Sequence, residues 1–181
     1  MRKTSVCLVA LFALSLAAAS VSSAQTMPKP SPEMDKVKWM VGNWQCTGKM
    51  MASPMGPEHP TEATVAAEMT LDGAWLLAHY REKKTAQNAM PVSGDEYWTY
   101  DNAEKMWDRI AVDSMGGFAT GTAKGWDKGA ITWSSDGMMG GQKMKFRDTY
   151  NRKSFKEISY VGEIGSADGK WTKGAEGTCK K

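Results

Sequence analysis

Two histidines, His59 and His79, are the side chains of this chain best suited to acid–base chemistry, and His79 is the stronger candidate. A carboxylate beside the imidazole could complete an acid–base pair, and Glu68 and Asp113 are the candidate partners. An isomerase or a hydrolase could use such a pair. A hydrogen-bonded structural histidine explains the same residue, so no catalytic residue is assigned. The sequence contains no Gly-x-Ser-x-Gly motif and no phosphate-binding loop.

Aromatic and basic side chains are mixed along the stretches with a strand-like pattern, and the chain has eight tryptophans. Trp75, His79 and Arg81 fall at alternating positions and therefore share one face of a predicted strand, as do Trp107 and Arg109 further along. Such a mixed face suits the wall of a wet cavity or a solvent-exposed surface, and periodicity alone does not choose between them. The candidate ligand-binding residues are Trp75, His79, Arg81, Trp98, Arg109, Trp133 and Arg147.

A methionine-rich loop is the one place where a metal could be considered. Met50, Met51 and Met55 lie near His59, and thioether and imidazole groups together could bind Cu(I) in an exported protein. Methionine also fills irregular cores, and the loop has no tight Met-x-Met repeat. We therefore assign no metal site and no cofactor.

The first 24 residues have the pattern of a secretory signal peptide. Arg2 and Lys3 precede an apolar run over 6–19, and Ser22 and Ala24 supply the small residues of a cleavage site after Ala24. An uncleaved N-terminal anchor is the alternative. Residues 25–30 are then a flexible lead-in, residues 31–181 form one domain, and the protein is expected to be periplasmic or secreted. The mature chain has no predicted integral membrane span.

The charge of the mature chain argues against a nucleic-acid partner. The formal net charge of the whole sequence is +3. Removal of Arg2 and Lys3 with the leader brings basic and acidic residues close to balance, and the remaining charges alternate in sign along the chain. Nucleic-acid binders instead concentrate positive charge on one surface.

Two cysteines remain after the leader, Cys46 and Cys179, near opposite ends of the mature chain. In an oxidising compartment an even pair most often forms a disulfide. Two free buried thiols are the alternative.

A short helix and a series of strands are expected to position these side chains. Ser31 and Pro32 begin the helix, its apolar stripe is Met34, Val37 and Val41, and Gly42 ends it. Turn signals such as Asp72-Gly73 and the glycine-rich 136–141 separate the strands. Strands are predicted at 44–50, 61–71, 74–83, 95–100, 105–112, 118–123, 130–134, 143–150, 154–161 and 170–179.

About ten short strands joined by local turns predict an all-β fold, an antiparallel up-and-down barrel with a short N-terminal helix. A long meander hides its two edge strands best by closing. Closure would also make the first and last strands neighbours, which is where Cys46 and Cys179 lie. An open sandwich is the alternative that could bring the same two strands together.

Several motifs strengthen this prediction through resemblance to known families. Gly42-Asn43-Trp44 after a short helix resembles the Gly-x-Trp start of lipocalin and other calycin barrels. In those barrels the tryptophan closes the floor and packs under a late arginine, a role that the resemblance gives here to Trp44 and to Arg147, with Arg109 second. The sequence is more closely similar to a bacterial family known as domain of unknown function 1579. The motifs that carry this similarity are Gly42–Gly48, Leu71–Leu76, Tyr100-Asp101, Val112–Gly117, Gly125-Trp126 and Thr178–Lys181. The resemblance implies an exported, lipocalin-like barrel. It does not point to any particular activity.

The expected function is binding of a small, largely apolar molecule inside the barrel, with tryptophans supplying most of the contact area. The alternatives are an enzyme that uses His79 with a carboxylate on the same scaffold, and a structural or interaction protein whose barrel is filled. The sequence leaves the oligomeric state open.

Overall fold

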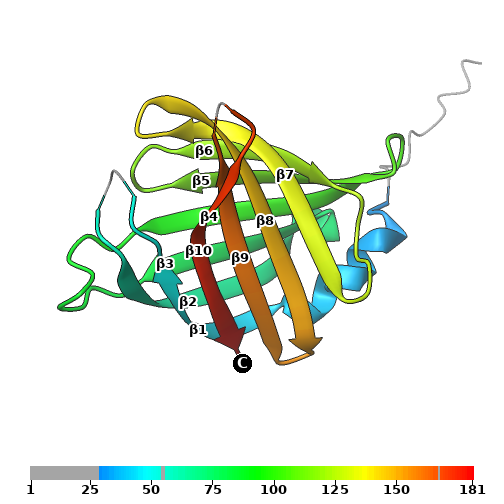
Figure 1. Ribbon diagram of the computed structural model, residues 1–181. Helices are drawn as coiled ribbons and strands as arrows, with labels where there is room; N and C mark the ends of the chain where they lie inside the picture. The colour runs from blue at the N-terminus through cyan, green and yellow to red at the C-terminus, as the bar shows by residue number, and fades with distance from the viewer. Residues whose placement is uncertain (1–28, 54–55, 167) are drawn as a thin grey trace, which may run out of the picture.

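The computed structural model describes residues 29–53, 56–166 and 168–181 (Figure 1). The predicted signal peptide, most of the lead-in and Met55 lie outside these residues. No helix in the described part of the chain is long and apolar enough to cross a membrane.

Ten strands form one closed barrel in which each strand pairs antiparallel with the next along the chain, and β1 pairs with β10. The predicted all-β, ten-stranded up-and-down barrel with a short N-terminal helix is confirmed. The strands are β1 (Gly42–Met50), β2 (His59–Thr70), β3 (Trp75–Glu82), β4 (Ser93–Asp101), β5 (Met106–Asp113), β6 (Phe118–Ala123), β7 (Ala130–Met139), β8 (Gln142–Ser154), β9 (Glu157–Gly165) and β10 (Trp171–Lys180).

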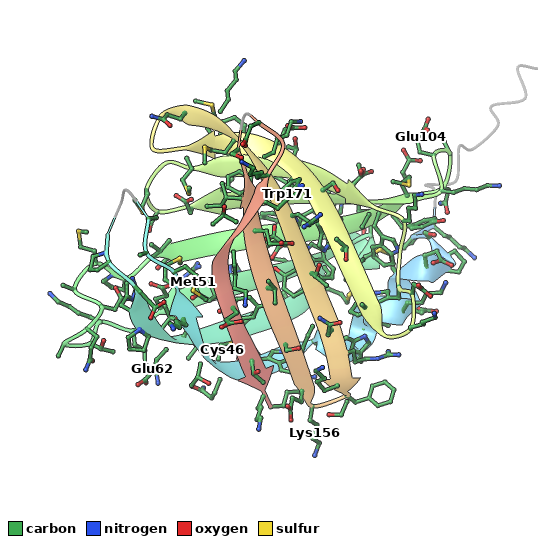
Figure 2. The ribbon with its side chains drawn as sticks, in the orientation of Figure 1. Cys46, Met51, Glu62, Glu104, Lys156 and Trp171 are labelled. Atoms are coloured by element: carbon green, nitrogen blue, oxygen red, sulfur yellow. A yellow bond between two sulfur atoms is a disulfide. The ribbon has the colours of Figure 1, made fainter. Side chains whose placement is uncertain are left out.

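The closure of the barrel is reinforced by a covalent bond. Cys46 and Cys179 are register partners where β1 meets β10, and their sulfur atoms form a disulfide (Figure 2). The alternative of two free thiols is therefore wrong. In the chain-entropy model, a bridge across a loop of this length contributes at most about 5 kcal/mol to stability.

The helix η1 (Pro32–Met40) has 3-10 geometry and closes one end of the barrel (Figure 1). The Ser31 hydroxyl accepts a hydrogen bond from the Glu33 amide, as expected for a helix cap. Side chains three residues apart share a face in a 3-10 helix, so the buried stripe is Met34, Val37 and the partly buried Met40. The prediction that Val41 completes the stripe assumed an α-helical period and is wrong, because Val41 is 39% exposed.

Two turns differ from their sequence-based descriptions. The β2–β3 connection runs through the short helix η2 (Leu71–Gly73) and Ala74, so it is longer than a two-residue Asp72-Gly73 turn. The β7–β8 hairpin turns only at Gly140 and Gly141, whose φ angles of 57° and 77° fit the tight turn that favours glycine. As a result β7 extends into the predicted turn region as far as Met139, and β8 begins at Gln142.

The interior divides into two halves along the barrel axis. The half beside η1, called the closed half, is filled by an apolar core of Met34, Val37, Ala67, Leu76, Trp98, Trp107, Ala123, Ile131 and Trp133. The other half, called the open half, lies toward the β5–β6 and β7–β8 turns. A hydrogen bond from Ser31 to Asn102 in the β4–β5 turn ties η1 to the closed end.

Candidate functional site

A buried arginine lies at the centre of the open half. Arg109 points inward from β5, and its side chain is 4% exposed. Its register partner on β6 is Gly121, whose own partner on β7 is Ser135. A Cβ at Gly121 would collide with the Ser135 hydroxyl. The glycine therefore leaves room for Arg109 Nη2 to donate a 2.7 Å hydrogen bond across β6 to Ser135 Oγ.

Two carboxylates bind the terminal nitrogens of this guanidinium, while its buried Nε has no hydrogen-bond partner among the described residues. Arg109 Nη1 donates to Glu96 Oε1 at 3.0 Å, and Nη2 donates to Asp148 Oδ2 at 2.5 Å. Tyr150 donates its hydroxyl proton to the other Glu96 oxygen at 3.1 Å. Arg109, Glu96, Asp148, Tyr150 and Ser135 are called the arginine cluster below.

Burial and charge shift the proton affinities within the cluster. Burial raises the pKa of Asp148, although the charge and the hydrogen bond of Arg109 offset part of that effect. Burial also raises the pKa of Tyr150 well above its usual value, so the phenol stays protonated. The carboxylates of Glu96 and Asp148 raise the pKa of Arg109 despite its desolvation. The cluster therefore holds a permanent cation between two acids.

A cavity of about 260 Å³ opens above the arginine cluster. Its polar side is formed by Glu96, Arg109, Asp148 and Tyr150, and Asp113 at the end of β5 lines it as well. Most of its remaining wall is apolar and includes Ala111, Ala119, Met139 and Phe146. Small-molecule sites commonly combine an apolar wall with a few convergent polar groups in this way.

Two tryptophans separate the cavity from the closed half. The rings of Trp98 and Trp133 are 4.8 Å apart, and the Arg109 guanidinium carbon lies 5.4 Å from the Trp133 ring centre. Tyr150 packs against Trp98 at 5.4 Å. Because both indoles are almost completely buried, they form the floor beneath the arginine cluster.

The structure brings three of the predicted ligand-binding residues together and places four elsewhere. Trp98, Arg109 and Trp133 meet inside the barrel. Trp75, His79 and Arg81 do not line the interior, because Leu76, Ala78 and Tyr80 are the β3 residues that pack into the core. Arg147 lies outside as well, since its neighbour Asp148 points inward.

The outward residues of β3 form a small ion-pair group. His79 Nδ1 lies 2.9 Å from Asp95 Oδ1, and Arg81 Nη1 donates to the same oxygen at 2.8 Å. The hydrogen bond with His79 and the contacts with Arg81 lower the pKa of Asp95. Glu68 is only at the edge of contact, 4.0 Å from His79 Nε2, and Asp113 instead accepts hydrogen bonds from the β5–β6 turn.

The expected contact between Arg147 and Trp44 is wrong. Arg147 instead pairs with Glu163 and stacks on Trp171, with 4.5 Å between its guanidinium carbon and the ring centre. The cation over Trp44 is Lys181, whose ammonium lies 4.6 Å from the ring centre. The Lys181 ammonium also donates to the carbonyls of Trp39 and Val41, so it joins the end of β10 to the end of η1.

Sequence reasoning missed four members of the arginine cluster, and a usable signal was present. Glu96 lies two residues before Trp98, and Ser135 lies two residues after Trp133, so each shares an inward face with a tryptophan. Asp148 and Tyr150 alternate on β8 in the same manner. Assigning the tryptophans to the interior would have identified the polar residues beside them.

The described residues contain no candidate metal site, because no three His, Cys, Asp or Glu side chains among them are arranged to hold an ion. Met50 and His59 are register partners on β1 and β2. Met55 is outside the described residues, so the copper interpretation stays untested.

A solved structure supports the fold, and two designed or engineered proteins are similar at lower scores. The crystal structure of Rv2717c from M. tuberculosis superposes with a TM-score of 0.66 at 11% identity and covers 84% of this chain and 99% of that chain. A de novo designed fluorescence-activating β-barrel gives a TM-score of 0.44 at 12% identity, covering 81% of this chain and 97% of the design. The barrel EF1p2_mFAP2b bound to DFHBI gives 0.46 at 11% identity, covering 82% of this chain and 98% of that one. No curated protein matches the sequence.

The family model described as "Protein of unknown function (DUF1579)" matches residues 29–181, which include the whole barrel, η1 and the arginine cluster. The chain therefore belongs to the DUF1579 family.

Proposed function

We propose that this protein binds a small, largely apolar molecule in the cavity of the open half. The observation that carries the proposal is the cavity itself, where an apolar wall ends at a buried cluster of polar groups. The apolar part of the ligand would contact Ala111, Met139 and Phe146. The arginine cluster would fix the orientation of its polar group.

Export to the periplasm or beyond the cell is part of the same proposal. The disulfide between Cys46 and Cys179 supports it, because such bonds persist in oxidising compartments. Residues 1–24 have the leader pattern that would direct this export.

The two alternatives receive less support from the described residues. An enzyme built on His79 would work on the outer face of β3, where the imidazole is paired with Asp95 and Glu68 lies at the edge of contact. A fully packed barrel describes the closed half well, but the open half holds the cavity.

The test is to fill the cavity and leave the fold intact. Ala119 lines the cavity from β6, whereas the next residue, Thr120, is exposed on the outer face of the same strand. Ala119→Phe would block the cavity, and Thr120→Phe adds the same ring outside as a matched control. Native mass spectrometry of each protein, purified from its own host, would detect a co-purifying small molecule.

We expect the wild-type protein and Thr120→Phe to carry the same bound mass, and Ala119→Phe to lose it. A ligand that remains on Ala119→Phe and disappears from Thr120→Phe would place binding in the outer groove beside Thr120 and overturn the proposal. A wild-type protein that is always free of ligand would also count against it.

A further inference from the structure

The charge of the arginine cluster is unbalanced, and this bears on which ligands the cavity could select. The cluster contains one guanidinium, from Arg109, and two carboxylates, from Glu96 and Asp148. Asp113 lines the same cavity, so with all three acids ionised its wall carries a formal excess of two negative charges. A buried charge without a partner is costly, so a positively charged ligand would gain from this site and a negatively charged ligand would lose.

Arg109 is poorly placed to receive an anion. Nη1 and Nη2 already donate to Glu96, Ser135 and Asp148 at distances between 2.5 and 3.0 Å. An incoming carboxylate or phosphate would have to displace charged partners that are already in contact. Its own charge would then lie beside the two acids that it displaced.

One carboxylate oxygen of the cluster remains open. Both oxygens of Glu96 accept hydrogen bonds, from Arg109 and from Tyr150. Asp148 uses Oδ2 for Arg109, and among the described residues no donor is bonded to its Oδ1. The Asp148 side chain is 27% exposed and lines the cavity, so a bound molecule can reach it.

The strand beside Asp148 leaves space at this oxygen. Its register partner on β9 is Gly162, and a Cβ at that position would come within 3.0 Å of Asp148 Oδ1. A side chain at residue 162 would therefore crowd this oxygen. Burial raises the pKa of Asp148 because it penalises the charged form, and an ammonium group beside Oδ1 would offset part of that penalty.

Building on the proposed function, we propose that the ligand is an amine with a small apolar body, whose ammonium group donates to Asp148 Oδ1. The apolar body then lies against Ala111, Ala119, Met139 and Phe146. Arg109 acts as a positioning residue that fixes the carboxylates rather than as a receptor for an anion.

The experiment compares three probes of the same length, hexylamine, hexanol and hexanoate, by isothermal titration calorimetry at pH 7 with the full mature chain. We expect hexylamine to bind at least tenfold more tightly than hexanol, and hexanoate to bind no more tightly than hexanol. Asp148→Asn should reduce the affinity for hexylamine to that for hexanol. Asp136→Asn removes an acid from the exposed face of β7, where it pairs with Lys145, and should leave all three affinities unchanged.

The outcomes separate this inference from the proposed function. If all three probes bind equally and Ala119→Phe abolishes their binding, the cavity binds ligands but the preference for amines is wrong. If hexanoate binds most tightly in the wild-type protein, the preference is also wrong, whether or not Asp148→Asn folds. If hexylamine binding is unchanged in Ala119→Phe, the amine is bound outside the cavity and both proposals fail.

Discussion

The closed and open halves of the barrel are built from the same strands, yet their interiors differ completely. On β5, Trp107 is 1% exposed in an apolar core, while Arg109, the next inward residue, lies in an ion-pair cluster. The same step is made on two other strands. The pairs are Trp98 and Glu96 on β4, and Trp133 and Ser135 on β7.

This difference shows that one small barrel can use one half of its interior for stability and keep the other half available for a ligand. The closed half gains free energy from burying large aromatic side chains and a helix. The open half leaves space and polar groups instead, which contribute little to stability but can contact a ligand. The boundary is a single layer of side chains that contains Trp98 and Trp133.

The prediction with the largest expected effect tests whether the closed half supplies most of the free energy of unfolding. Trp107→Ala should lower the free energy of unfolding by about 3–5 kcal/mol, because it opens a cavity in a packed core. Phe146→Ala, in the cavity wall of the open half, should cost only about 1 kcal/mol, because this ring is partly exposed. Urea unfolding with the disulfide intact measures the free energy of unfolding of both variants. Equal losses would mean that the two halves contribute equally to stability.

The second prediction concerns the arginine cluster. Arg109→Met should cost about 2–3 kcal/mol, because it leaves the acids Glu96 and Asp148 close together without their cation. Replacing all three charges in Glu96→Gln/Arg109→Met/Asp148→Asn should cost less than half as much. The same unfolding measurement applies, and a triple variant less stable than Arg109→Met would show that the cluster is a net source of stability.

The third prediction compares two alanines on the inward face of β6. Ala123 is 3% exposed in the closed-half core, and Ala119 lines the cavity. Ala123→Phe should destabilise the protein by about 1–3 kcal/mol through overpacking, whereas Ala119→Phe should change stability by less than about 0.5 kcal/mol. Thermal unfolding of the two variants is sufficient, and a strongly destabilised Ala119→Phe would mean that the open half is packed as well.

The smallest effect concerns pH and contrasts an acid inside the open half with one outside the barrel. The pKa of Asp148 is raised above its ordinary value of 3.8, so its contribution to stability falls as the pH rises from that value through the raised pKa. The pKa of Asp95 is lowered, so its contribution is present above 3.8 and is lost as the pH falls through the lowered pKa.

Unfolding free energies between pH 3 and pH 7, compared with those of Asp148→Asn and Asp95→Asn, measure the two contributions. The differences between wild type and variant should have opposite slopes against pH. Two slopes of the same sign would contradict the opposite pKa shifts assigned to Asp148 and Asp95.

The sequence by itself placed the strands of the chain and favoured its closure and its covalent bond. Alternating side chains and turn residues act locally, so ten strands and nearly all of their connections could be placed without knowledge of the fold. The glycine-rich hairpin at Gly140-Gly141 was located, although its length was not. Cys46 and Cys179, on the first and last strands, supported closure because a disulfide requires the two strands to lie close together.

The tertiary structure alone decided which face of each strand points inward and which side chains meet across the barrel. A period of two has the same form whichever face is buried, so Trp75, His79 and Arg81 could be grouped correctly and still not be assigned to a side. Contacts such as Lys181 with Trp44, or Arg109 with Asp148, join residues distant in sequence. They depend on the register of every strand between them, which short-range patterns do not encode.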